Sequence, residues 1–111
     1  MAIAISSSSA SIGTTEYFLN AGSTTASYST TDTIVQVVCD FVNMAAGDEY
    51  QITVYDKVDG TNARNIYRVT LEGAQTIPLS TPAILLDNWE VGIKKIAGTD
   101  RTIYYSVRKV T

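Results

Sequence analysis

Apolar and polar side chains alternate along residues 89–110, and this alternation is the strongest structural constraint in the chain. Alternation of apolar and polar residues with a period of two is typical of a half-buried β-strand. The segment Ala97-Gly98-Thr99-Asp100-Arg101 between the two alternating runs is typical of a turn. We therefore predict a β-hairpin whose buried face is apolar. The apolar positions are Trp89, Val91 and Ile93 in the first run and Ile103, Tyr105 and Val107 in the second.

A five-residue loop would set the register of this hairpin, because it places Val91 opposite Val107 and matches apolar side chains on one face. Glu90 and Arg108 would then lie opposite each other on the other face and form an exposed ion pair. We expect such a pair to contribute only about 0–1 kcal/mol to stability. The residues predicted to face outward, into solvent or a subunit contact, are Glu90, Lys94, Tyr104 and Arg108.

The rest of the chain consists of short apolar runs separated by turns about every ten residues. Residues 50–55 and 64–71 are predicted to form a second hairpin, and Pro78 makes residues 75–79 fit an edge strand. No segment has a helical pattern. We predict an all-β fold with one domain over residues 12–111, an antiparallel β-sandwich (jelly-roll or immunoglobulin-like) of about seven to nine short strands.

Residues 1–11 are rich in serine and are predicted to form a flexible N-terminal arm. The arm is either a frayed end or a segment that becomes ordered against a neighbouring subunit, since Ile3 and Ile5 are unusual residues to leave in solvent. The N-terminus lacks the positive charge and the apolar length of a signal peptide, and no segment is long enough to span a membrane. We expect synthesis in the cytoplasm and no membrane partner.

Residues 33–44 form the longest apolar run, and it is apolar on both faces. Such a strand is either covered on both sides within the domain or buried at a subunit interface. Tyr104 and Tyr105 are adjacent in a strand and must point to opposite faces, so one of them is exposed or lies at an interface. The candidate interface residues are Ile3, Ile5, Ile34, Val38, Val42, Tyr104 and Arg108.

Charge is distributed unevenly along the chain. Residues 1–56 contain six acidic residues and no basic residue, whereas residues 57–111 contain eight basic and five acidic residues. Either strands from the two halves neutralise each other within one sheet, or the molecule has an acidic end and a basic end suited to head-to-tail contacts. No cluster of basic residues is dense enough to predict binding to nucleic acid.

The residue types needed for common catalytic sites are scarce. The chain has no histidine, which is the usual general base. Its one cysteine, Cys39, lies in an apolar strand pattern, which predicts a buried hydrophobic side chain. The carboxylates that could form a catalytic pair lie mostly at turns, where such groups usually bind backbone N–H groups. The segment 56–62 lacks two of the acidic residues of a calcium loop. We predict no enzyme activity, no cofactor and no metal. The candidate carboxylates are Asp40, Asp48, Glu49, Asp56 and Asp59.

Several motifs resemble a family of small proteins encoded by many tailed bacteriophages among their virion structural genes. The resemblance covers most of the chain, and its most specific part is the Ala-Gly-Thr-Asp-Arg loop after a strand that contains tryptophan. It implies a non-enzymatic virion component. The residues that carry it are Ser11-Ile12-Gly13-Thr14-Thr15-Glu16-Tyr17, Met44-Ala45-Ala46-Gly47-Asp48, Val54-Tyr55-Asp56-Lys57-Val58, Pro82, Leu85, Trp89, Lys95-Ile96-Ala97-Gly98-Thr99-Asp100-Arg101 and Ile103.

Three functions are compatible with these features. The first is a capsid decoration protein that binds the major capsid protein, or other virion proteins, on the outside of the head as a homo-oligomer, with a trimer favoured. The second is a tail or head–tail connector protein. The third, of another class, is a carbohydrate-binding module that uses exposed tyrosines and Trp89.

Overall fold

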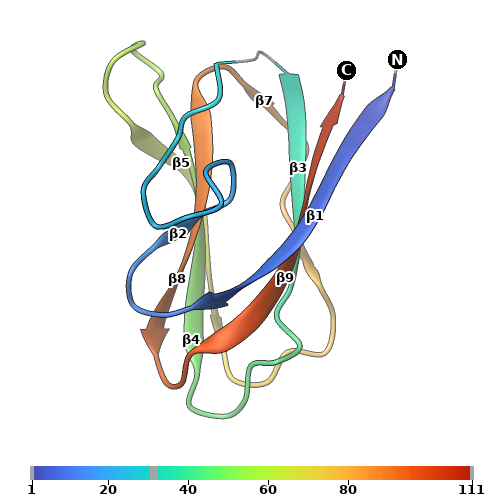
Figure 1. The fold of residues 1–111 in the computed structure, drawn as a ribbon, viewed down its shortest axis with the longest axis vertical. Coiled ribbons are helices and arrows are strands. Elements are labelled where there is room, and N and C mark those ends of the chain that lie inside the picture. Colours follow the sequence, from blue (N-terminus) through green and yellow to red (C-terminus); the bar gives the residue numbers. More distant parts are fainter. Residues whose placement is uncertain (1, 31–32, 111) are drawn as a thin grey trace.

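The computed structural model describes residues 2–30 and 33–110, which fold into two antiparallel β-sheets packed face to face (Figure 1). We call the sheet that contains both terminal strands sheet A. Its strands in spatial order are β1 (Ile3–Ile12), β9 (Arg101–Val110), β3 (Thr33–Asp40) and β6 (Leu79–Ser80), and β7 (Ile84–Leu86) also pairs with β3.

Sheet B lies opposite sheet A. Its strands in spatial order are β2 (Tyr17–Phe18), β8 (Trp89–Ala97), β4 (Glu49–Asp56) and β5 (Arg64–Glu72). With the three-residue strand β7 set aside, this strand order is that of a double-sheet jelly roll. The predicted all-β sandwich is therefore confirmed. Strands from the acidic and the basic half of the chain alternate within both sheets, as β3 beside β9 and β4 beside β8 show.

The core lies between the two sheets and is built from alternate residues of each strand. Val35, Val37 and Cys39 of β3 point inward, and Tyr50, Ile52 and Val54 of β4 face them from the other sheet. The predicted buried face of residues 89–110 is also correct, since its five predicted members are all buried. These are Trp89, Val91, Ile93, Tyr105 and Val107.

The predicted hairpin between residues 89–97 and 101–110 is wrong. β8 belongs to sheet B and β9 to sheet A, so the loop between them crosses from one sheet to the other. Val91 pairs with Val54, and Val107 pairs with Val37. The two apolar faces meet across the core instead of lying side by side on one ribbon. Alternation determines which side chains point inward, but it does not determine the neighbouring strand.

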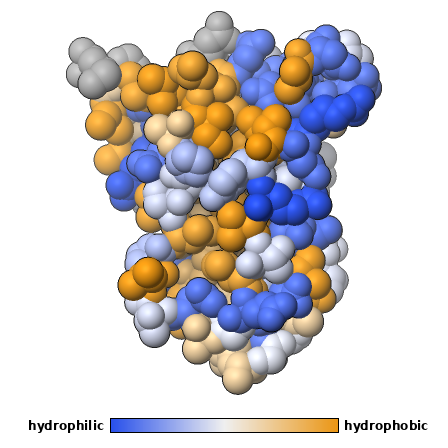
Figure 2. Space-filling model, turned by 180° about the vertical axis from the view of Figure 1, so that it is seen from behind, coloured by the Kyte–Doolittle hydropathy of each residue, from blue (hydrophilic) through white to orange (hydrophobic). Residues whose placement is uncertain are grey.

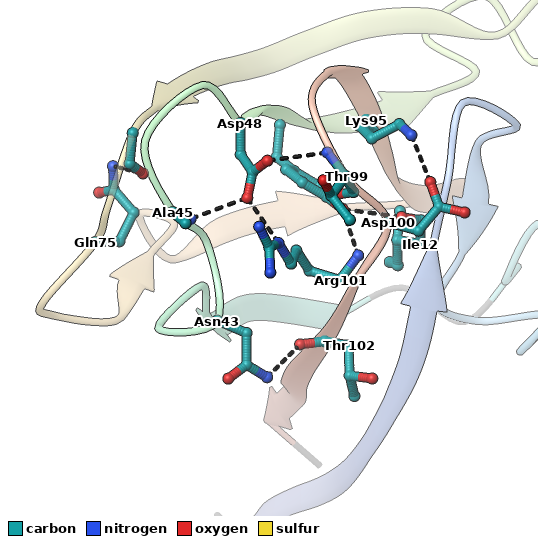
Figure 3. Close-up of polar contacts among 12 residues, drawn as sticks. Ile12, Asn43, Ala45, Asp48, Gln75, Lys95, Thr99, Asp100, Arg101 and Thr102 are labelled. Atoms are coloured by element: carbon teal, nitrogen blue, oxygen red, sulfur yellow. Dashed lines mark hydrogen bonds and ion pairs between the residues drawn. The ribbon is translucent and has the colours of Figure 1, made fainter.

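The crossing loop is held by Asp48 (Figure 3) and by the hydroxyl of Tyr50. Asp48 accepts hydrogen bonds from the N–H groups of Thr99 (2.9 Å) and Ala45 (2.9 Å) and from Nε of Arg101 (2.8 Å). The Tyr50 hydroxyl accepts the Arg101 N–H at 2.7 Å. Gly98 has φ +92°, and a Cβ there would lie 2.6 Å from Cα of Asp48. The loop that carries the most specific part of the resemblance therefore has a structural role.

The second predicted hairpin is present as β4 and β5, and Pro78 directly precedes the two-residue edge strand β6. The prediction of a flexible N-terminal arm is wrong. The serine-rich segment forms β1, which pairs with β9 along its whole length from Ile3 to Ile12. Backbone hydrogen bonds to β9 do not depend on large side chains, so a run of serines can form this edge strand. The expected boundary between residues 11 and 12 falls inside β1.

Glu90 is fully buried, which contradicts the prediction that it faces Arg108 in solvent. The segment after β2 folds over the outer face of sheet B and surrounds its carboxylate. Glu90 accepts hydrogen bonds from the N–H groups of Asn20 (2.8 Å), Ala21 (3.2 Å) and Ser27 (3.2 Å). Burial raises the pKa of Glu90, and the backbone N–H groups oppose this shift.

Candidate assembly surface on sheet A

The outer face of sheet A carries large apolar side chains that are exposed to solvent. Directly paired residues of neighbouring strands lie on the same face, and the pairing of Ile3 with Val110 and of Ile5 with Arg108 places both isoleucines outside. Each of these isoleucines is 61% exposed, and Leu85 of β7 is 80% exposed. Figure 2 shows apolar side chains gathered at the end of the molecule where both termini lie. We call this outer face of sheet A the assembly surface.

Two shallow hollows lie on the assembly surface. One, of about 210 Å³, is lined by Ile3, Ile5 and Ile34 together with the basic residues Arg108 and Lys109. The other, of about 270 Å³, lies further along the strands and is lined by serines of β1 together with Val38, Asp40, Pro78 and Tyr104. The charged residues of the first hollow are basic, whereas the charged residue of the second hollow is the acidic Asp40.

Six of the seven candidate interface residues lie on the assembly surface. The seventh, Val42, is exposed in the turn after β3, where its N–H donates to Oδ1 of Asp40 at 3.0 Å. Their role in an interface stays a prediction. Sequence reasoning missed Leu85, because it lies in an apolar run that reads as a buried strand. The six residues on the surface are Ile3, Ile5, Ile34, Val38, Tyr104 and Arg108.

The outer face of sheet B is different. Its β8 part is covered by the segment that follows β1, where Glu16 accepts a hydrogen bond from the Tyr55 hydroxyl at 2.7 Å. Its β5 part is exposed and carries Arg68 and Glu72, with Arg68 donating to the Thr53 hydroxyl at 3.2 Å. Ile66 is the large apolar residue of β5 that is exposed there. Sheet A therefore has the more apolar outer face.

Four of the five carboxylates considered for a catalytic pair accept hydrogen bonds from backbone N–H groups. Asp59 accepts hydrogen bonds from the N–H groups of Thr61 (2.9 Å) and Asn62 (2.7 Å), and these bonds lower its pKa to about 2. Asp56 accepts the Asp87 N–H at 3.3 Å. The N–H groups of Thr99 and Ala45 lower the pKa of Asp48 to about 2. Among the described residues, no group of three or more potential metal ligands comes together.

Cys39 and Trp89 both point into the core. Cys39 is fully buried, and burial raises the pKa of its thiol to about 12. The indole of Trp89 is also fully buried, with the ammonium of Lys109 lying 5.4 Å from its ring centre. Trp89 therefore cannot stack on a sugar in this structure, which removes one of the aromatic residues considered for a carbohydrate site.

No helix in residues 2–30 and 33–110 is long and apolar enough to cross a membrane.

No protein-family model and no curated protein matches the chain. Its fold is similar to that of a chain in a solved structure described as Bacillus endospore appendages, which form a family of disulfide-linked pili. The two share 13% sequence identity with a TM-score of 0.57, and the match covers 98% of this chain and 87% of the other. At this identity the likeness supports the jelly-roll fold alone.

Proposed function

We propose that this protein is a non-enzymatic structural subunit of a bacteriophage virion that self-associates through the assembly surface and decorates the outside of the head. The observation that carries the proposal is the uncovered apolar character of that surface, with Ile3, Ile5 and Leu85 each more than half exposed. Burying such side chains in a subunit contact yields roughly 1.5–3 kcal/mol each. A contiguous exposed apolar patch of this kind marks an interaction site.

The motifs described above resemble those of virion structural proteins of tailed bacteriophages. This resemblance supports the virion as the particle that contains the protein. The Ala-Gly-Thr-Asp-Arg loop of that resemblance is held by hydrogen bonds to Asp48, so it contributes to folding. A tail or head–tail connector subunit would use the same surface in the same way. No observation of the described residues supports the trimer expected for a decoration protein, and measurement of the oligomeric state tests it.

A filament subunit is the second candidate, favoured by the fold shared with a pilus protein. A filament of this chain would need a different linkage from a disulfide, because Cys39 is the single cysteine and lies in the core. Contacts between sheet faces or sheet edges would have to hold such a filament together.

Localisation of the protein in purified particles tests the proposal. We expect mass spectrometry of purified virions to detect the protein, and we expect gold-labelled antibody to mark the head surface in electron micrographs. Label on the tail would select the connector alternative. Virions that lack the protein would overturn the proposal, and fibres formed by the purified chain would then favour the filament subunit.

A further inference from the structure

We propose that the assembly surface binds the same surface of a second copy of this chain, related by a two-fold axis. The inference rests on the proposed role as an assembling subunit and names its first partner. It comes from the positions of the two charged residues, Arg108 and Asp40, on a face that is otherwise apolar or uncharged.

The strand register places the two charges symmetrically. Val38 pairs directly with Ser106, and two residues further in one direction Gln36 pairs with Arg108. Two residues in the other direction Asp40 pairs with Tyr104. The pair Val38 and Ser106 is thus the midpoint between the positive and the negative position on the assembly surface.

A two-fold axis that lies in the contact plane and crosses the strands at this midpoint exchanges the two ends of the surface. It places Arg108 of one copy over Tyr104 and beside Asp40 of the other copy. The contact occurs twice, as a two-fold interface requires. Each guanidinium would gain a carboxylate partner and an aromatic ring within one contact.

Within residues 2–30 and 33–110, neither charge is satisfied by an opposite charge. Four residues separate their positions along the sheet, which is about 13 Å. Among the described residues, the ion pairs are those of Lys95 with Asp100 and of Arg101 with Asp48. Arg108 donates from Nε to the Ser106 hydroxyl at 3.2 Å, and Asp40 accepts the Val42 N–H.

The apolar parts of the surface are exchanged by the same axis. The axis places Val38 over Val38 of the second copy, and it places the end of the surface with Ile3 and Ile5 over the end with Ser9 and Ser11. Tyr104 is half exposed and projects from this surface. The contact is therefore apolar at Val38, places isoleucines over serines on β1, and sets each positive position beside a negative one. This self-complementarity favours a second copy over a partner of another kind.

Charge reversal and rescue test the two-fold pairing. We expect wild-type protein to be dimeric by sedimentation equilibrium, and we expect Arg108→Asp alone and Asp40→Arg alone to raise the dimer dissociation constant at least about 30-fold. An equal mixture of the two variants should form heterodimers near the wild-type dissociation constant, because both contacts are then attractive. Arg68→Asp, the same change on the outer face of sheet B, should leave dimerisation unchanged.

Circular dichroism and Trp89 fluorescence show whether each variant is folded, and a variant that unfolds is replaced by Arg108→Ala or Asp40→Ala. A wild-type chain that is monomeric at its highest soluble concentration overturns the pairing. So does a trimer, or a mixture of the variants that stays monomeric while each is folded. These outcomes leave open the presence of the protein in virions, which is tested separately.

Discussion

Glu90 accepts a hydrogen bond from the backbone N–H of Asn20 at 2.8 Å, although 69 residues lie between them in the sequence. The carboxylate is the anchor for the segment that follows β2, because two more N–H groups of that segment also point at it. One buried side chain thereby determines where a serine- and threonine-rich loop lies on sheet B.

Replacing Glu90 by alanine should lower the free energy of unfolding by about 2–4 kcal/mol, because several buried N–H groups lose their acceptor. This is the opposite of the small effect expected for an exposed ion pair. Urea denaturation followed by Trp89 fluorescence measures the change. Glu72→Ala, at an exposed position of β5, is the matched control and should alter stability by less than about 0.5 kcal/mol. Equal effects of the two substitutions would show that Glu90 is not the anchor.

The alternation of side chains was sufficient to predict the inner face of most strands. It could not identify the strand partners, since β8 and β9 satisfy the same pattern whether they pair with each other or face each other across the core. It also placed Glu90 outside, because every second residue of β8 points away from the core. The backbone N–H groups that cover Glu90 belong to a loop with no apolar pattern, so no sequence signal indicated that it would be buried.

The candidate interface residues of β3 are predicted because they are apolar at positions where a solvated sheet face would be polar. That reasoning found Ile34 and Val38 on β3, and the structure places them beside Tyr104 and Arg108 of β9. It could not reveal the symmetric positions of Arg108 and Asp40. Those positions depend on the register between β3 and β9, which pairs Arg108 with Gln36 and Asp40 with Tyr104.

Gly98 should be far less tolerant of substitution than Gly60, although both have positive φ angles, of 92° and 83°. At Gly60 nothing lies within 4 Å of an added Cβ, so Gly60→Ala should cost only the conformational strain of about 1–2 kcal/mol. At Gly98 the added Cβ would also overlap the backbone of Asp48, and we expect a loss of about 3 kcal/mol or more. Thermal denaturation of the two variants gives the comparison. A smaller effect at Gly98 would mean that the crossing loop can shift away from Asp48.

Acid should weaken the crossing loop. The pKa of Asp48 is lowered from its ordinary value of 3.8 to about 2 by the N–H groups of Thr99 and Ala45. A lowered pKa in the folded state means that the ionised group stabilises the fold above about pH 4, and that this contribution is lost as the pH falls towards 2. The stability difference between wild type and Asp48→Asn should therefore shrink over this interval. Parallel stability curves from pH 6 to pH 2 would contradict this role of Asp48.

The Cys39 thiol should be unreactive while the protein is folded. It is fully buried with a pKa of about 12, so little thiolate exists at pH 8 and reagents cannot reach the sulfur. We expect iodoacetamide to modify the native protein at least about 100-fold more slowly than the urea-unfolded protein. A reducing agent should also leave the oligomer intact, whereas dissociation by dithiothreitol would indicate a disulfide between subunits.

Tyr104→Ala should weaken self-association without unfolding the subunit, whatever the symmetry of the contact. The side chain is half exposed on the assembly surface, so its removal costs the monomer little packing. Loss of an aromatic residue from the centre of an interface typically costs about 2 kcal/mol, which corresponds to a roughly 30-fold higher dissociation constant. Ile66→Ala removes an exposed apolar side chain from the outer face of sheet B and should leave the dissociation constant unchanged. If Ile66→Ala weakened association and Tyr104→Ala did not, the contact would lie on sheet B, and the outer face of sheet A would need another explanation.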